Sequence, residues 1–413
     1  MSLVHRGTKK FLQINLALFA AGFVTFVTLY DVQPLLPVFA AEFGVSAALS
    51  SLPLSLATCT MAVSMLVAGT LSETWGRKRI MTGAMLITSA IAILTAFSNS
   101  LPTLATLRFL QGMALAGLPA VAMAYLSEEM DPSALSSAMG LYIAGNAAGG
   151  MTGRIVTAAV TDYSSWRVAL GAVGILCLIT SMYFAKALPP SANFQQRPFQ
   201  PRYLYTSLLQ NLHNRALLYL YAVVFMLMGS FVTLYNYITF RLLAPPYNLS
   251  QTMVSWIFLA YILGSFSSAM VGKQAQRFGR STTLLASLLV MLCGALITLL
   301  GNLVAIIIGI GIFTIGFFGS HTTASSWVGA RVQTARAQAS SLYLFFYYLG
   351  GSITGTTGGI FWSESGWGGV IALISVNLVI AVALTVRLAV FLKNRQAAEN
   401  EAGHNQELKA GTI

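Results

Sequence analysis

The chain has 413 residues, of which 56% are hydrophobic and only 8% are charged. Soluble proteins carry about 25% charged residues, so this composition excludes an ordinary soluble fold. The net charge of +12 does not indicate a partner nucleic acid, because the basic residues stand in short clusters between long apolar stretches and form no continuous stripe.

Apolar stretches of about 18 residues or more, long enough to cross the hydrocarbon core of a bilayer, recur along the chain. We therefore predict an all-α polytopic membrane protein with twelve transmembrane helices. The first span follows Lys9 and Lys10 but is too long for the core of a signal peptide, so we expect it to stay attached. The predicted spans are 13–40, 47–71, 80–98, 102–126, 135–160, 166–186, 216–243, 251–272, 281–300, 303–328, 339–362 and 367–391.

These spans divide the chain into two six-helix bundles with short polar segments around them. A Pro-rich stretch, 187–215, is predicted to be a cytoplasmic linker between the halves, and the polar tail is predicted to be disordered. The predicted segments are a cytoplasmic N-terminus 1–12, an N-terminal bundle 13–186, the linker 187–215, a C-terminal bundle 216–391 and a cytoplasmic tail 392–413.

The basic residues predict the orientation of the bundles, because Lys and Arg near span ends are retained on the cytoplasmic side. Most of the 23 basic residues fall on the side of the two termini, whereas Arg167 and Arg241 fall on the other side. Both termini are therefore expected in the cytoplasm, with the lipid bilayer around the spans.

Three sequence matches at nearly one offset indicate an internal duplication. Thr-Leu-Tyr-Asp at 28–31 recurs as Thr-Leu-Tyr-Asn at 233–236, an offset of 205. Two further matches, at offsets of 203 and 205, pair Gly69, Gly76 and Arg77 with Gly272, Gly279 and Arg280, and pair Gly145 and Gly150 with Gly350 and Gly355. The duplication predicts two pseudo-symmetric bundles with a cavity between them.

The loop between the second and third spans reads GTLSETWGRKR at 69–79. It resembles the loop signature of the major facilitator superfamily, with Glu73 in place of the usual aspartate. The resemblance implies a conformational latch on the cytoplasmic face, where an acid at a helix end meets arginines. Ordinary positive-inside topology is the alternative explanation of the basic residues. The predicted latch residues are Gly69, Glu73, Gly76, Arg77, Arg79, Gly272, Gly279 and Arg280.

Two further motifs support the same resemblance. Arg108, Gln111 and Gly112 share one face of the fourth span, and the glycines of 145–150 resemble an antiporter motif, with Asn146 where that motif has proline. The closest branch is the twelve-span drug:proton antiporters, in particular the acriflavine-sensitivity type of inner-membrane exporter. This resemblance implies a monomer in a bacterial inner membrane that exports small molecules by alternating access, driven by protons. Asn146 leaves open the alternative of a sugar or organic-acid transporter.

Asp31 is the one acidic residue well inside a predicted span, and Arg108 and Arg154 lie at a similar depth. Ionisable groups are costly inside a membrane and usually mark a transport pathway. We therefore predict that Asp31 takes and releases the transported proton, while Arg108 and Arg154 favour its ionised form. A permanent structural ion pair is the alternative.

The predicted substrate contacts lie on spans 1, 4, 5, 7 and 11. Aromatic residues suit hydrophobic or cationic compounds, whereas amide side chains would suit a sugar. Aromatic residues that only pack or mark the membrane interface are the alternative. The predicted contacts are Tyr30, Gln111, Asn146, Tyr235, Asn236, Tyr237, Tyr343 and Tyr347.

The sequence does not indicate an enzyme, a metal site or a cofactor. It contains no phosphate-binding glycine loop and no nucleophile elbow. Cys59, Cys177 and Cys293 lie far apart inside apolar stretches, without the paired spacing that holds a metal.

Overall fold

The computed structural model describes residues 3–196, 198, 200–332 and 336–410, with side chains for all of these except 203, 336, 337 and 396–410. Helices make up almost all of this part of the chain, and two short 3-10 turns, η1 and η2, interrupt them. The elements are α1 (Lys9–Tyr30), η1 (Gln33–Leu35), α2 (Leu36–Phe43), α3 (Ala47–Ser50), α4 (Leu52–Trp75), α5 (Arg77–Thr95), α6 (Leu101–Leu115), α7 (Pro119–Glu129), α8 (Pro132–Tyr163), α9 (Trp166–Ala187), α10 (Pro201–His213), α11 (Arg215–Leu243), α12 (Gln251–Ser255), η2 (Trp256–Leu259), α13 (Ala260–Phe278), α14 (Arg280–Ile297), α15 (Leu303–Arg331) and α16 (Arg336–Ala410).

The prediction of an all-α membrane protein is confirmed. Ten helical stretches in the described part of the chain are long and apolar enough to cross a membrane. One of them, Gln338–Arg395, bends at Gly366 and corresponds to the last two predicted spans. The 32-residue α8 is not among the ten, because many small and polar residues lower its hydropathy. Each of the twelve predicted spans therefore corresponds to a helix.

Local chemistry explains where the first helix ends. The carbonyl of Tyr30 would accept a helical hydrogen bond from residue 34, but Pro34 has no N–H. The regular helix accordingly ends at Tyr30, Asp31 occupies the C-cap position, and a 3-10 turn leads into α2. The break places Asp31 beside backbone carbonyls that need a hydrogen-bond donor from outside α1.

The packing within the two halves repeats, as the duplicated sequence predicts. In the first half, a Cβ atom at Gly145 would overlap the backbone of Phe19, so α8 lies directly against α1. In the second half, a Cβ atom at Gly350 would overlap the backbone of Phe225, so α16 lies directly against α11. Small residues at corresponding positions thus permit the same close helix approach in both halves.

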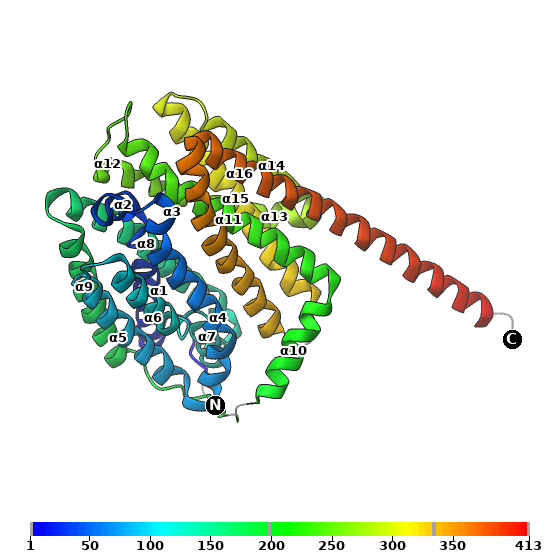
Figure 1. Ribbon diagram of the computed structural model, residues 1–413. Coiled ribbons are helices and arrows are strands. Elements are labelled where there is room, and N and C mark those ends of the chain that lie inside the picture. The colour runs from blue at the N-terminus through cyan, green and yellow to red at the C-terminus, as the bar shows by residue number, and fades with distance from the viewer. Residues whose placement is uncertain (1–2, 197, 199, 333–335, 411–413) are drawn as a thin grey trace.

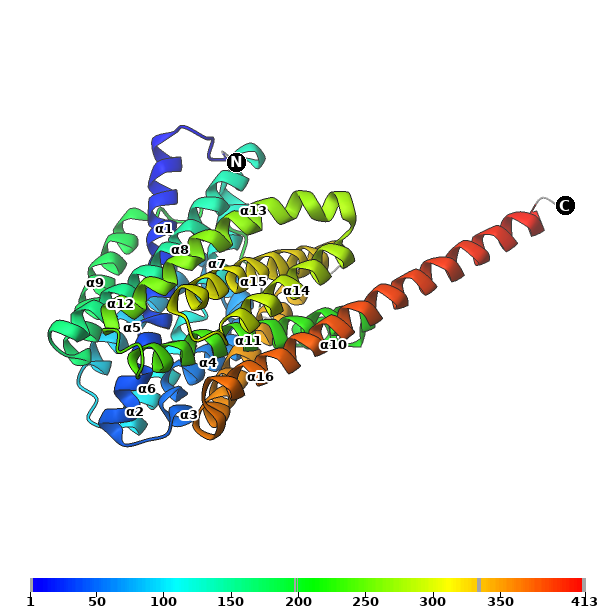
Figure 2. The same ribbon diagram turned by 90° about the horizontal axis from the view of Figure 1, so that it is seen from above.

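The two halves stand side by side (Figure 1). Between them, α8 packs against α12 and η2, and α16 packs against α3 and α4, while α11 packs against η1 and α2. We call the end of the molecule opposite the loop at 75–77 the predicted outer side, and the end that contains this loop the predicted cytoplasmic side. The short elements among these, α2, α3 and α12, lie toward the predicted outer side (Figures 1 and 2).

Two polar segments differ from the expectation. The predicted linker is partly helical, because α10 occupies Pro201–His213 within it. The expectation of a disordered tail is wrong for residues 392–410, where α16 continues to Ala410 and projects away from the bundles (Figure 1). Most residues of the segment AAENEAGHNQELKA are good helix formers such as Ala, Glu, Gln, Leu and Lys, although Gly403 and two asparagines are not, and this composition is consistent with a continued helix. Residues 411–413 of the predicted tail lie outside the described part.

Candidate functional site

A buried ion pair joins the first and fourth predicted spans. Nη1 of Arg108 lies 3.1 Å from Oδ1 of Asp31, and the two side chains are 1% and 2% exposed. Asp31 follows the last residue of α1, and Arg108 lies in α6. The sequence predicted both residues as partners at one depth, and the structure places them in contact.

Arg108 also satisfies the backbone at the break in α1. Its Nη1 and Nη2 atoms donate to the carbonyls of Thr28 and Leu29, at 2.5 and 2.6 Å. Nε donates to the carbonyl of Pro53 at 3.3 Å, and Nη1 lies 2.7 Å from Oε1 of Gln111. Four oxygen atoms besides the Asp31 carboxylate therefore hold the guanidinium. Protonation of Asp31 would not leave Arg108 without acceptors, and this lowers the cost of such a change.

Arg154 takes a different partner from the predicted one. Its Nε atom donates to Oε1 of Gln33 at 2.7 Å, and its Nη1 atom donates to the carbonyl of Gly150 at 2.6 Å. In the described part of the chain it makes no ion pair with Asp31. Nε2 of Gln33 donates to Oδ1 of Asn236 at 2.8 Å. Arg154 is thus linked through Gln33 to the second half of the molecule.

Sequence reasoning missed Gln33. The only signal in the sequence was an amide residue two positions after Asp31, inside the predicted first span. Its side chain lies between the halves and is fully buried. An amide can accept from one partner and donate to another, and Gln33 uses both capacities here.

Aromatic rings surround the Arg154 guanidinium from both halves. Its Cζ atom lies 4.2 Å from the ring centre of Tyr30, 4.8 Å from that of Phe258 and 5.0 Å from that of Tyr261. Tyr30 belongs to the first half, whereas Phe258 and Tyr261 belong to the second. These cation–π contacts add to the attraction between the halves.

The rings continue into the second half as one group, which we call the aromatic cluster. Successive ring contacts connect its members, with centroid distances between 3.7 and 6.4 Å. At one end, the Tyr343 hydroxyl lies 2.9 Å from Nδ1 of His321. The cluster comprises Phe231, Tyr235, Phe258, Tyr261, Phe313, Phe317, Phe318, His321, Tyr343, Tyr347 and Tyr348.

The predicted substrate residues fall into two groups. Tyr30, Tyr235, Tyr343 and Tyr347 lie in or beside the aromatic cluster, and Tyr347 is partly exposed. The other four contact protein groups outside the aromatic cluster. Gln111 is fully buried beside Arg108, Asn236 binds Gln33, the Tyr237 hydroxyl donates to the carbonyl of Gly355 at 2.6 Å, and Asn146 packs against Gly22.

The predicted latch has a different acidic partner from the expected one. Arg77 lies 3.9 Å from Glu73 but only 2.7 Å from Glu128 at the end of α7. Arg77 also donates to the hydroxyl of Ser72. The short contact therefore joins α5 to α7, and sequence reasoning missed Glu128 because it lies outside the motif. Arg79 has no carboxylate within ion-pair distance in the described residues.

In the second half, the corresponding turn keeps the glycine, and its arginine has no ion pair among the side chains that the structure describes. Gly76 and Gly279 adopt φ angles of 94° and 83°, which glycine tolerates and other residues rarely adopt. Each therefore ends one helix and begins the next in its half. Among the described residues, Arg280 has no carboxylate within ion-pair distance, and a Cβ atom at Gly69 or Gly272 would meet no neighbour.

The segment after α9 covers the Arg77 pair. The ring of Phe194 lies 5.7 Å from the Arg77 guanidinium, and the backbone N–H of Asn193 donates to Glu129 at 2.8 Å. Nε2 of Gln196 donates to the carbonyl of Thr74 at 2.9 Å. The beginning of the predicted linker is therefore fixed to the first half.

Polar contacts join the halves toward the predicted outer side. The carboxylate of Asp162 accepts hydrogen bonds from the backbone N–H groups of Gln251 and Thr252, at 3.1 and 2.7 Å. Thr58 and Ser352 share a hydrogen bond of 2.7 Å. Asp162 thereby caps the N-terminus of α12 from the opposite half, where a negative charge is favourable.

Comparison with known proteins identifies the family. The family model "Major Facilitator Superfamily" matches residues 16–247 and 238–410, and the ten membrane-long helical stretches in the described part of the chain agree with it. The chain therefore belongs to the major facilitator superfamily and is a membrane transporter, not an enzyme.

Two similar transporters cover nearly the whole chain, and a third covers 70% of it. It is 48% identical over 405 residues to "Uncharacterized MFS-type transporter YybF" of Bacillus subtilis (strain 168), covering 98% of this chain and 100% of that protein. It is 46% identical over 385 residues to "Inner membrane transport protein YnfM" of Escherichia coli (strain K12), covering 93% and 92%. It is 26% identical over 298 residues, 70% of each chain, to "Chloramphenicol resistance protein CraA" of Acinetobacter baumannii.

Solved structures show the same fold. A bacterial homolog to the human lysosomal transporter Spinster, in an inward-facing and occupied conformation, superposes with a TM-score of 0.75 and 13% identity. The alignment covers 93% of this chain and 98% of that one. A mutant of the nucleoside transporter NupG superposes with a TM-score of 0.74 at 13% identity, covering 91% and 99%.

Proposed function

We propose that this protein is a proton-coupled exporter of small hydrophobic compounds in a bacterial inner membrane, with both termini in the cytoplasm. The observation that carries the proposal is the buried ion pair between Asp31 and Arg108. Asp31 lies where α1 breaks, between the helical core of the first half and the elements that meet the second half. A proton bound there changes a charge two residues from Gln33, which contacts the second half.

Alternating access would couple the proton to the substrate. When Asp31 is ionised, its ion pair with Arg108 holds the end of α1 against α6. When Asp31 is protonated, Arg108 keeps its other acceptors and the attraction between α1 and α6 weakens. In this scheme the proton on Asp31 and the bound substrate favour different positions of α1. Binding of one therefore disfavours binding of the other. The name of the chloramphenicol resistance relative supports export of a hydrophobic compound.

The substrate would bind against the aromatic cluster. Its rings offer apolar surface and offset stacking, and Tyr30 and Arg154 approach it from the other half. The nearby fixed charge is the cation Arg154, so uncharged compounds are favoured over the cationic ones that the sequence also allowed.

A second candidate is an organic acid. Arg154 lies between the halves among aromatic rings, and a guanidinium there would attract a carboxylate. An organic acid that carries its own proton could also move without any titration of Asp31.

Transport into liposomes tests the proposal. The purified protein is reconstituted, an internal dye reports pH, and uncharged aromatic compounds, organic acids and sugars are added under an imposed proton gradient. We expect proton movement that depends on an uncharged aromatic compound and that Asp31→Asn abolishes. Glu42→Gln is the matched control, because Glu42 pairs with Arg167 at a partly exposed site. Transport by Asp31→Asn that still depends fully on the gradient would contradict the role of Asp31.

A further inference from the structure

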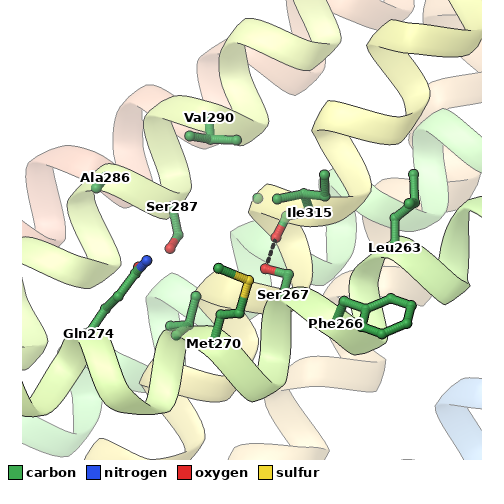
Figure 3. Close-up of a pocket in the computed structure, with 11 residues that line it drawn as sticks. Leu263, Phe266, Ser267, Met270, Gln274, Ala286, Ser287, Val290 and Ile315 are labelled. Carbon is green, nitrogen blue, oxygen red and sulfur yellow. Dashed lines mark hydrogen bonds between the residues drawn. The ribbon is translucent and has the colours of Figure 1, made fainter.

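A groove of about 440 Å³ lies on the surface of the second half, along α13 (Figure 3). One face of α13 forms one side, α14 forms the other, and α15 contributes to the lining through Ile315 and Gly316. Figure 3 shows Gln274 pointing toward Ser287 across the groove. The apolar wall residues are Leu263, Phe266, Met270, Val290 and Ile315.

The walls of the groove are apolar side chains exposed at the surface of the second half. Phe266 is 67% exposed and Met270 is 62% exposed, although both lie on a helical stretch long and apolar enough to cross a membrane. Large apolar side chains exposed on the outside of a membrane-spanning helix are suited to contact with acyl chains. The groove is therefore a recess in the lipid-facing surface, separate from the aromatic cluster.

The groove matches one leaflet in depth. From Leu263 to Gln274 the rise along α13 is roughly 16 Å, at about 1.5 Å per residue. Half of a hydrocarbon core of about 30 Å is close to this length. Gln274 lies one turn before the end of α13 at Phe278, so the groove runs from near the bilayer centre to the predicted cytoplasmic surface.

Basic side chains gather at that surface. Lys273, Arg277 and Arg280 are exposed at the end of α13 and the beginning of α14. In the described part of the chain none of the three has a carboxylate within ion-pair distance. Arg277 lies three residues after Gln274, and therefore on a neighbouring part of the same helix face. An apolar groove thus ends at unpaired positive charge.

We propose that this groove binds an anionic phospholipid of the cytoplasmic leaflet. One acyl chain lies along Phe266 and Met270, and Lys273 and Arg277 hold the phosphate headgroup. Gln274, a polar side chain at the end of an apolar groove, hydrogen-bonds the ester region between chain and headgroup. Positive charge alone would retain the loop on the cytoplasmic side, but only the combination with a groove one leaflet long selects a particular lipid.

Native mass spectrometry of the full-length protein tests this proposal. The detergent-purified protein is titrated with phosphatidylglycerol or phosphatidylcholine of equal chain length, and bound lipids are counted. We expect tighter retention of phosphatidylglycerol. Lys273→Gln with Arg277→Gln should weaken it about tenfold or more, and Ala286→Phe, which fills the groove, should weaken both lipids.

The matched control is Lys9→Gln with Lys10→Gln, which removes two basic residues from the other half at the same predicted surface. It should leave the binding unchanged. Equal retention of the two lipids, or equal weakening by the control, would overturn the proposal. Thermal melting of each lipid-free variant identifies misfolded protein. If Lys273→Gln with Arg277→Gln misfolds, Gln274→Leu and Ala286→Phe take its place, and unchanged lipid binding in both would overturn the proposal.

Discussion

Nε2 of Gln33 lies 2.8 Å from Oδ1 of Asn236, so one hydrogen bond joins the first half of the molecule to the second. Asn236 is the counterpart of Asp31 at the repeat offset of 205. The position that carries the ion pair in the first half therefore carries a contact between halves in the second. Duplication supplied similar positions, and divergence gave them different chemistry.

Asn236→Leu should favour the state in which the predicted outer side is open. It removes a buried hydrogen bond between the halves, worth about 0.5–1.5 kcal/mol, while Gln33 keeps its contact with Arg154. We expect a shift in population of about twofold to tenfold. Spin labels on Tyr163→Cys and Met253→Cys, at positions 90% and 60% exposed, would measure it in a protein without native cysteines.

The control for that experiment is Asn377→Leu, a buried asparagine in the last span of the second half. It should leave the distance distribution unchanged. An unchanged distribution in Asn236→Leu as well would mean that this hydrogen bond does not hold the halves together.

Asp162→Ala should also favour opening on the predicted outer side. The carboxylate caps α12 across the interface between the halves, and loss of such a cap costs about 0.5–2 kcal/mol. The same pair of labelled positions reports the opening. Asp131→Ala removes a cap within one half, so it should lower thermal stability without moving the labels apart.

Glu128→Gln should destabilise the protein more than Glu73→Gln does. Glu128 lies 2.7 Å from Arg77 and Glu73 lies 3.9 Å away. A double-mutant cycle with Arg77→Gln, followed by thermal melting in detergent, should give a coupling energy of about 0.5–3 kcal/mol for Glu128. A greater coupling energy between Arg77 and Glu73 would mean that Glu73, the acid of the motif, is the main partner of Arg77.

Gly145→Ala should lower the melting temperature, because a Cβ atom there would overlap the backbone of Phe19. Separation of two closely packed helices costs about 1–3 kcal/mol. Gly140→Ala, five residues away on the same helix, is the control, since a Cβ atom at Gly140 would meet no neighbour within 4 Å. Equal melting temperatures for the two variants would contradict the close approach of α1 and α8.

The amino-acid sequence by itself determined the class of fold. A bilayer requires about 20 apolar residues for each crossing, so the spans are visible in composition alone, and duplicated glycines revealed the two halves. The single acid inside a span also marked Asp31 without any structure. These features depend on residues close together in sequence or on a repeated spacing.

Only the tertiary structure decided which side chains meet. The pairing of Arg154 with Gln33, of Arg77 with Glu128 and of Asp162 with α12 depends on how each helix is rotated and how deeply it sits. A rotation of one residue turns a helical side chain by about 100°, and hydropathy does not resolve such a change. Apart from the pair of Asp31 and Arg108, which their similar depth suggested, the contacts that join distant parts of the chain could not be predicted from motif and spacing.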